Sequence, residues 1–99
     1  MTHRVAPQAI GDLDNIWFYV ANESGSVEIA DQLIDSITER FLLLSGHPYL
    51  GRRRDEDLGI GMRSFAVGDY VIVYCVAGAD ALILRVVHGR RDLESLFGQ

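Results

Sequence analysis

The spacing of the apolar residues changes once along this chain, close to Met62. Before that point, apolar side chains recur every three or four residues, which is the period of one face of a helix. After it, runs rich in β-branched and aromatic residues are separated by short turn signals. Helices that are followed by a block of strands, with no alternation between the two, predict a fold of the α+β class.

The second helical segment has the clearest periodicity. Its apolar stripe advances in steps of three and four, and acids and Gln32 occupy the other face; the stripe consists of Val27, Ala30, Ile34, Ile37, Phe41 and Leu44. Ser26 is a suitable N-cap, and Gly46 a suitable C-terminal stop. An earlier helix is predicted from Pro7 to about Asn22. Because the break between the two helices is short, we expect an antiparallel helical hairpin.

Three strands are predicted after the helices, and tight turns join them. The strands are Met62 to Val67, Tyr70 to Val76 and Ala81 to His88, with turns at Gly68-Asp69 and Gly78-Ala79-Asp80. Such short turns predict an antiparallel meander. A first strand is expected at residues 3–6, an irregular polar loop at residues 48–61, and a short helix or tail after the last strand.

Length and charge restrict the functional classes. The 99 residues fit a single domain, spanning 1–99, and no apolar run reaches the length of a membrane span. The N-terminus lacks the apolar core of a signal peptide, so a cytoplasmic location is expected. All nine basic residues are arginines, and the net charge is −5. An acidic domain is a poor candidate for general nucleic-acid binding, although a local arginine-lined groove stays open.

No metal or cofactor is expected from the cysteine and histidines. Cys75 is the single cysteine and lies in an apolar run, where a small buried side chain is the usual role. His3, His47 and His88 are far apart and lack the spacing of zinc ligands. No catalytic triad, phosphate-binding loop or pair of carboxylates appears.

Two arginines interrupt the predicted strands. Alternation places Arg63 on one face of its strand with Phe65, and places Arg85 on one face of the last strand with Ile83 and Val87. We expect both arginines on the sheet face that the helices leave open. There they repel each other unless an anion or an acidic partner lies between them. The alternative is that each pairs with an internal acid such as Asp92 or Glu56.

Two further polar groups are candidates for function. One follows the last strand and comprises His88, Gly89, Arg90, Arg91 and Asp92. The other is the basic triplet Arg52 to Arg54, which three acids follow, so a solvated, self-neutralising loop is the simpler interpretation.

Several segments, taken in order, resemble the ParE family, the toxin half of ParDE toxin–antitoxin pairs within the wider RelE/ParE superfamily. They are Pro7-x-Ala9-x-x-Asp12-Leu13-x-x-Ile16-Trp17-x-Tyr19, His47-Pro48-x-x-Gly51-Arg52-x-Arg54, Gly61-Met62-Arg63-Ser64-Phe65, Tyr70-Val71-Ile72-Val73-Tyr74 and Ile83-x-Arg85-Val86-x-His88-Gly89-x-Arg91-Asp92. The resemblance implies two helices packed on one face of a small antiparallel sheet, with the first strand paired to the meander.

The resemblance also implies a function. ParE-like toxins poison DNA gyrase by blocking religation, and a ParD-like antitoxin neutralises them in a hetero-oligomer that contacts DNA only through the antitoxin. RelE-type relatives are ribosome-dependent mRNA endoribonucleases, which is the alternative activity. A third interpretation is a binding module without toxicity. The expected antitoxin- or target-binding residues are Arg63, Phe65, Arg85, His88, Arg90 and Arg91.

Physical chemistry favours the gyrase inhibitor over the nuclease. Cleaving an RNA backbone requires proton transfer and stabilisation of a highly charged phosphorane. This acidic chain has no lysine, and His88 is the only evident proton-transfer group in that region. We therefore expect a protein-binding toxin without a catalytic site.

Overall fold

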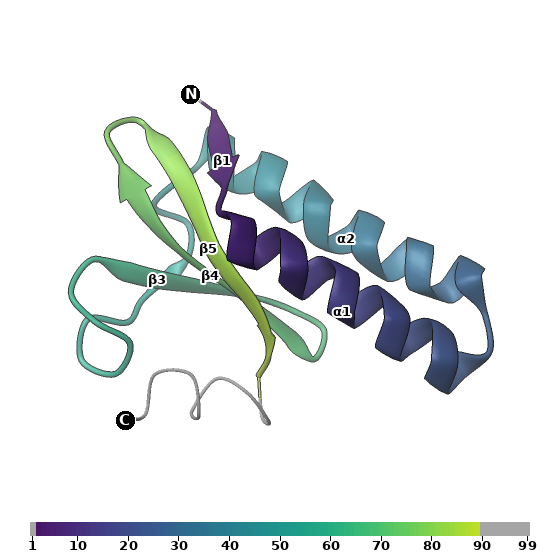
Figure 1. Ribbon diagram of the computed structural model, residues 1–99. Coiled ribbons are helices and arrows are strands. Elements are labelled where there is room, and N and C mark those ends of the chain that lie inside the picture. Colours follow the sequence, from purple (N-terminus) through teal and green to yellow (C-terminus); the bar gives the residue numbers. More distant parts are fainter. Residues whose placement is uncertain (1, 90–99) are drawn as a thin grey trace.

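The computed structural model describes residues 2–89, which form two helices and five strands. Figure 1 shows the helical hairpin on one side of a twisted sheet, with the N-terminal strand at the edge of the sheet beside the helices. In chain order the elements are β1 (His3–Val5), α1 (Pro7–Ser24), α2 (Val27–Gly46), β2 (Arg52–Arg53), β3 (Met62–Val67), β4 (Tyr70–Ala77) and β5 (Asp80–His88). The predicted short helix or tail after β5 lies outside the described residues.

The helical hairpin is confirmed, with α1 two residues longer than predicted. Gly25 stops α1 in the left-handed conformation at φ 68°, which a glycine adopts without steric cost. The Ser26 hydroxyl accepts a hydrogen bond from the Ile29 N–H at 3.2 Å and so caps α2. Trp17 on α1 donates its indole N–H to Asp31 on α2 at 2.7 Å, which ties the two helices together near the turn.

The sheet is mixed rather than purely antiparallel. Its strand order is β1-β5-β4-β3-β2, and β3, β4 and β5 form the predicted antiparallel meander. Strand β1 pairs with β5 in parallel, because the chain leaves β1 through both helices before it returns to the sheet. The residues predicted to form an irregular loop include β2, a two-residue edge strand that pairs Arg52 with Ser64 and Arg53 with Arg63.

The core fills the space between the hairpin and one face of the sheet. Alternate residues of β4 enter it, and they meet the buried stripe of α2; the members include Tyr70, Ile72, Tyr74, Ile37, Phe41 and Leu44. No helix within residues 2–89 is both long and apolar enough to cross a bilayer.

A β-bulge in β5 changes which side chains share a face. Tyr74 pairs with Ile83 and Val73 pairs with Arg85, so Leu84 is an extra residue without a partner on β4. Ile83 and Val86 therefore both lie in the core, although they are three residues apart. The predicted sharing of one face by Ile83, Arg85 and Val87 is wrong across this bulge, because simple alternation fails there.

Candidate functional site

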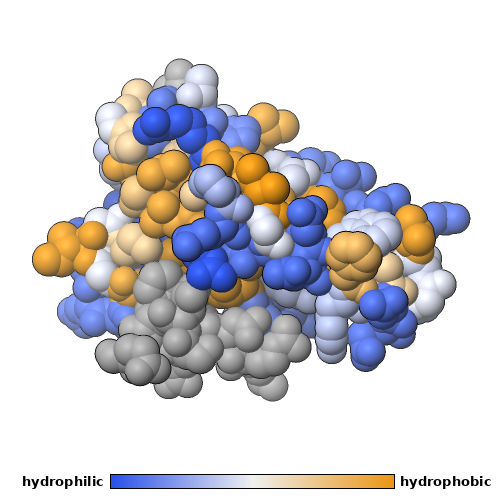
Figure 2. All heavy atoms as spheres, viewed as in Figure 1, coloured by the Kyte–Doolittle hydropathy of each residue, from blue (hydrophilic) through white to orange (hydrophobic). Residues whose placement is uncertain are grey.

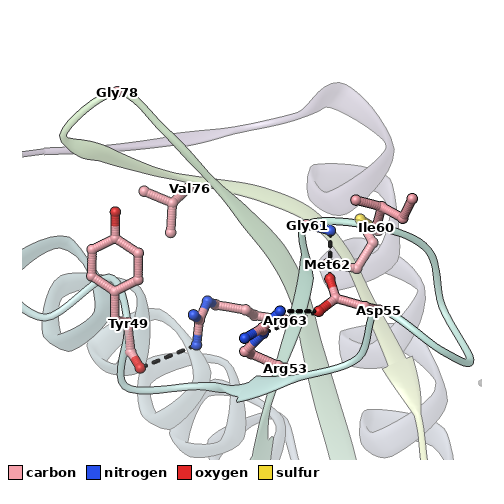
Figure 3. Close-up of a pocket in the computed structure, with 9 residues that line it drawn as sticks. All are labelled: Tyr49, Arg53, Asp55, Ile60, Gly61, Met62, Arg63, Val76 and Gly78. Atoms are coloured by element: carbon pink, nitrogen blue, oxygen red, sulfur yellow. Dashed lines mark hydrogen bonds and ion pairs between the residues drawn. The ribbon is translucent and has the colours of Figure 1, made fainter.

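A pocket with both polar and apolar walls surrounds Arg63, one of the predicted site residues. It has a volume of about 400 Å³ and lies where β3 begins and β4 passes into β5. The segment after α2 contributes Tyr49, and the turns before β3 contribute Asp55 and Ile60 (Figure 3). The segment after α2, the turns before β3 and the β4–β5 turn therefore meet around one guanidinium group.

Backbone carbonyls hold the Arg63 guanidinium in place. Its Nη1 donates to the carbonyl oxygen of Gly51 at 2.8 Å and to that of Tyr49 at 3.2 Å. Its Cζ lies 5.1 Å from the centroid of the Tyr49 ring, within the range of a cation–π contact. Within residues 2–89, no carboxylate oxygen comes within 4.0 Å of Arg63. The predicted alternative partner Glu56 thus does not neutralise it, and Asp92 lies outside the described residues.

A buried tyrosine fixes the loop that supplies those carbonyls. The Tyr74 hydroxyl accepts a hydrogen bond from the Gly51 N–H and donates one to the Pro48 carbonyl, both at 2.8 Å. The side chain is fully buried, and this burial raises the pKa of the Tyr74 phenol. A Cβ at Gly51 would lie 2.4 Å from the Tyr74 hydroxyl, so only glycine fits there. The loop geometry at Arg63 therefore depends on Tyr74 and Gly51.

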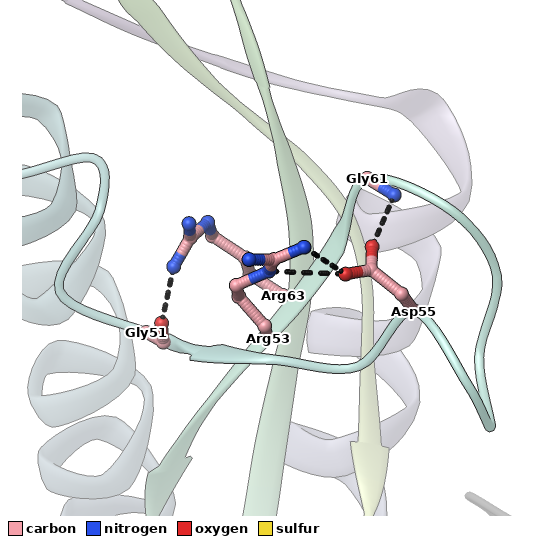
Figure 4. Close-up of polar contacts among 5 residues, drawn as sticks. All are labelled: Gly51, Arg53, Asp55, Gly61 and Arg63. Atoms are coloured by element: carbon pink, nitrogen blue, oxygen red, sulfur yellow. Dashed lines mark hydrogen bonds and ion pairs between the residues drawn. The ribbon is translucent and has the colours of Figure 1, made fainter.

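Asp55 organises the other side of the pocket. One carboxylate oxygen accepts the Gly61 N–H at 2.7 Å, and the other accepts Arg53 Nε at 3.0 Å and Nη2 at 2.7 Å (Figure 4). The Gly61 N–H and then Arg53 lower the pKa of Asp55. Two guanidinium groups and one carboxylate leave this cluster with a net charge of +1, on a chain whose net charge is −5.

Neither arginine lies on the sheet face that the helices leave open, so that prediction is wrong. Arg63 is on the face of β3 that turns toward the core, and Arg85 is bound to α1. Its Nε and Nη2 donate to the two carboxylate oxygens of Asp12 on α1, at 2.7 and 2.9 Å. Its partner is an internal acid, as the alternative interpretation required, but Asp12 rather than Asp92 or Glu56. No local signal in the sequence connects two residues that are 73 positions apart.

The remaining predicted residues are dispersed. Phe65 is half-buried and packs against the core on the same face as Arg63. The His88 ring packs edge-on against the Tyr70 ring, with 5.5 Å between the ring centroids. Arg90 and Arg91 lie outside the described residues. On β4, Arg63 is opposite Tyr74 and His88 is opposite Tyr70, four residues away. At ~3.3 Å per residue, the two are separated by about 13 Å along the strand alone.

Two arginines of the basic triplet make defined contacts, which a solvated loop would lack. Arg54 pairs with Asp57, and its Nη1 also donates to the buried Ser64 hydroxyl at 3.0 Å. Arg53 pairs with Asp55, whereas Arg52 is exposed. Residues 52–54 thus anchor the edge of the sheet to the turn that follows it.

A second, apolar hollow of about 410 Å³ lies between β1 and the two helices. It is lined by His3, Val5, Ile10, Leu13, Thr38, Glu39, Phe41 and Leu42. Ile10 and Leu42 are 51% and 64% exposed, which is high for large apolar side chains. Figure 2 shows apolar surface near the middle of the viewed face, where the sheet and the hairpin meet. Among residues 2–89, no cluster of three or more potential metal ligands occurs.

Comparison with known proteins gives a consistent result. Residues 4–93 match the family model described as the ParE toxin of the type II toxin–antitoxin system parDE. Toxin ParE3 of Caulobacter vibrioides is 37% identical over 89 residues, which are 90% of this chain and 87% of that protein. Toxin ParE1 of the same organism is 34% identical over 96 residues, 97% of each chain.

Solved structures share the fold. A chain of the chromosomal ParDE system from P. aeruginosa superposes with a TM-score of 0.77 at 23% identity, covering 89% of this chain and 95% of that one. A chain of the RelBE2 toxin–antitoxin complex from Mycobacterium tuberculosis superposes with a TM-score of 0.65 at 24% identity, covering 88% and 95%. The predicted α+β fold of the RelE/ParE type is confirmed.

Proposed function

Because the chain belongs to the ParE toxin family of type II toxin–antitoxin systems, we propose that it acts by binding DNA gyrase and blocking religation, without an active site of its own. A ParD-like antitoxin neutralises it in a hetero-oligomer, and DNA is contacted only through the antitoxin. Such a target places the protein in the cytoplasm.

The dispersal of the candidate residues is the observation that supports binding over catalysis. A nuclease needs its proton-transfer group and its cations around one phosphate. Here Arg63 and His88 lie about 13 Å apart along the strand direction at ~3.3 Å per residue. Arg85 is engaged by both carboxylate oxygens of Asp12. The arrangement therefore favours a toxin whose side chains contact another protein.

The hollow beside β1 also favours a protein partner. Its lining includes Ile10 and Leu42, two large apolar side chains that are exposed. Exposed apolar residues of this kind form the surface that a protein partner covers.

A supercoiling assay with purified gyrase tests the proposal. In molar excess, the wild-type protein should abolish ATP-dependent supercoiling of relaxed plasmid, and prior addition of the antitoxin from the neighbouring reading frame should restore it. Unchanged supercoiling at toxin excess would refute gyrase as the target.

A translating extract provides the contrasting measurement. The endoribonuclease alternative requires ribosome-dependent mRNA cleavage that His88→Ala or Arg63→Ala abolishes. We expect no such cleavage with the wild-type protein, and its appearance would replace the gyrase proposal with the nuclease. Harmless expression without antitoxin would support a non-toxic binding module instead.

A further inference from the structure

We propose that the pocket around Arg63 is a binding site for a carboxylate, and that its occupant is an acidic side chain of the antitoxin. The proposal rests on the toxin–antitoxin function above and adds to it a defined contact. It concerns the cluster of Arg63, Tyr49, Arg53 and Asp55, referred to below as the Arg63 pocket.

The guanidinium is preorganised but not neutralised. Within residues 2–89, both hydrogen bonds of the Arg63 guanidinium use Nη1, and both acceptors are uncharged backbone carbonyls. The Nε–Nη2 edge, which is the edge that receives a carboxylate in a bidentate pair, has no carboxylate within 4.0 Å among residues 2–89. Little side-chain freedom is left to lose when an anion arrives, and preorganisation of this kind strengthens binding.

Asp55, the acid that lines the same pocket, is hydrogen-bonded to other groups. Asp55 directs one oxygen to the Gly61 N–H and the other to Arg53, so its hydrogen bonds lie away from Arg63 (Figure 4). The cluster keeps one uncompensated positive charge beside a cavity of about 400 Å³. One carboxylate of a partner would balance it, whereas a phosphate dianion would exceed it.

The walls of the pocket indicate that the carboxylate belongs to a polypeptide. The Tyr49 ring, which lies against the Arg63 guanidinium, is 68% exposed, and Ile60 on the opposite rim is 95% exposed (Figure 3). An aromatic ring and an aliphatic side chain on either side of a cation suit an acidic residue flanked by apolar ones. Exposed apolar surface of this kind is usually covered by a partner protein. We assign the antitoxin as the occupant, because it is the protein that binds the toxin before the toxin meets its target.

The first experiment uses a minimal probe on the full-length protein. N-acetyl-glutamate methylamide, titrated in NMR, should shift the Arg63 Nε–H resonance and the Tyr49 ring resonances along a saturable curve. N-acetyl-glutamine methylamide, the neutral match, should leave them in place. Equal shifts with the two compounds, or an Arg63→Gln variant with undiminished shifts at Tyr49, would overturn the site.

The second experiment measures the antitoxin itself. Binding of the antitoxin from the neighbouring reading frame should weaken roughly 10- to 100-fold for Arg63→Gln, the range expected for a charge-assisted hydrogen bond. Arg52→Gln, an exposed arginine on the adjacent strand, is the matched control and should change binding less than about threefold. Thermal melting checks that each variant is folded. Arg63→Lys keeps the positive charge but loses the planar guanidinium, so its antitoxin affinity should lie between those of the wild type and Arg63→Gln.

The two proposals fail separately. Equal antitoxin affinities for Arg63→Gln and Arg52→Gln would overturn the carboxylate site while leaving the gyrase assay untouched. If gyrase supercoiling stays intact while the N-acetyl-glutamate methylamide titration saturates, gyrase is not the target but the carboxylate site at Arg63 is supported.

Discussion

Asp12 on α1 and Arg85 on β5 form a bidentate ion pair at the edge of the sheet. Arg85 Nε donates to Asp12 Oδ2 at 2.7 Å and Nη2 donates to Oδ1 at 2.9 Å, while Oδ2 also accepts the Val86 N–H at 2.9 Å. The pairing of β1 with β5 ends at Ile83. Asp12 thus provides an acceptor for the backbone of β5 beyond the point where its neighbouring strand ends, and it joins helix and sheet through one side chain.

Replacing Asp12 should destabilise the fold. Asp12→Ala leaves the partly buried Arg85 guanidinium and the Val86 N–H without this acceptor, so the free energy of unfolding should fall by about 2–3 kcal/mol in chemical denaturation. Asp14→Ala, an exposed acid two residues along the same helix, is the control and should change it by less than ~0.5 kcal/mol. Equal effects of the two variants would contradict the role of the pair.

Removing the Tyr74 hydroxyl tests whether it stabilises the loop that contains Pro48 and Gly51. Tyr74→Phe keeps the ring but leaves the Gly51 N–H and the Pro48 carbonyl without their partner, at a cost of about 1–3 kcal/mol in unfolding free energy. Because Gly51 also supplies a carbonyl to Arg63, the Arg63 Nε–H resonance should shift in the folded variant. An unchanged stability would show that water replaces the hydroxyl without loss.

Two glycine-to-alanine substitutions should change the free energy of unfolding in opposite directions. At Gly51 the new Cβ would meet the Tyr74 hydroxyl at 2.4 Å and the Ser64 carbonyl at 2.9 Å, so overpacking should cost ~1–3 kcal/mol. At Gly11, inside α1, no atom lies within 4 Å of the new Cβ. Gly11→Ala should therefore raise the free energy of unfolding by about 0.5–1 kcal/mol through helix propensity. Melting temperatures that move in the same direction would refute this assignment.

Acid should weaken the turn that Asp55 organises. The Gly61 N–H and Arg53 lower the pKa of Asp55 in the folded protein below its ordinary value. A group with a depressed folded pKa stabilises the fold at neutral pH, and this contribution is lost as the pH falls from the unfolded pKa through the lower folded pKa. The stability difference between wild type and Asp55→Asn should thus be largest near neutral pH and shrink under acid. A stability difference that grows on acidification would contradict a lowered pKa of Asp55 in the folded protein.

The parts of the fold that local patterns determine were predictable. The stripe from Val27 to Leu44 and the turn at Gly68-Asp69 specify α2 and the β3–β4 hairpin, because helix periodicity and turn chemistry act over a few residues. The two-residue strand β2 is too short to show alternation within a charged segment.

The contacts that define the site were not predictable in the same way. The bulge at Leu84 changes which side chains of β5 face the core, and no pattern in the surrounding residues indicates it. The Asp12–Arg85 pair spans 73 positions and the Tyr74–Gly51 contact spans 23, so both depend on the completed fold. The position of Arg63 within an apolar strand made it a candidate site residue, whereas no sequence pattern pointed to its neighbour Tyr49.

The central claim, that this toxin poisons gyrase rather than cutting RNA, is tested most directly by trapping the cleaved intermediate. Purified gyrase, supercoiled plasmid and excess toxin are quenched with detergent and treated with protease, and linear DNA is quantified by gel. We predict linear DNA that increases with toxin, carries gyrase at its ends before proteolysis, and disappears when antitoxin is added first. Plasmid that stays intact at saturating toxin, alongside ribosome-dependent mRNA cleavage by the same preparation, would contradict the claim.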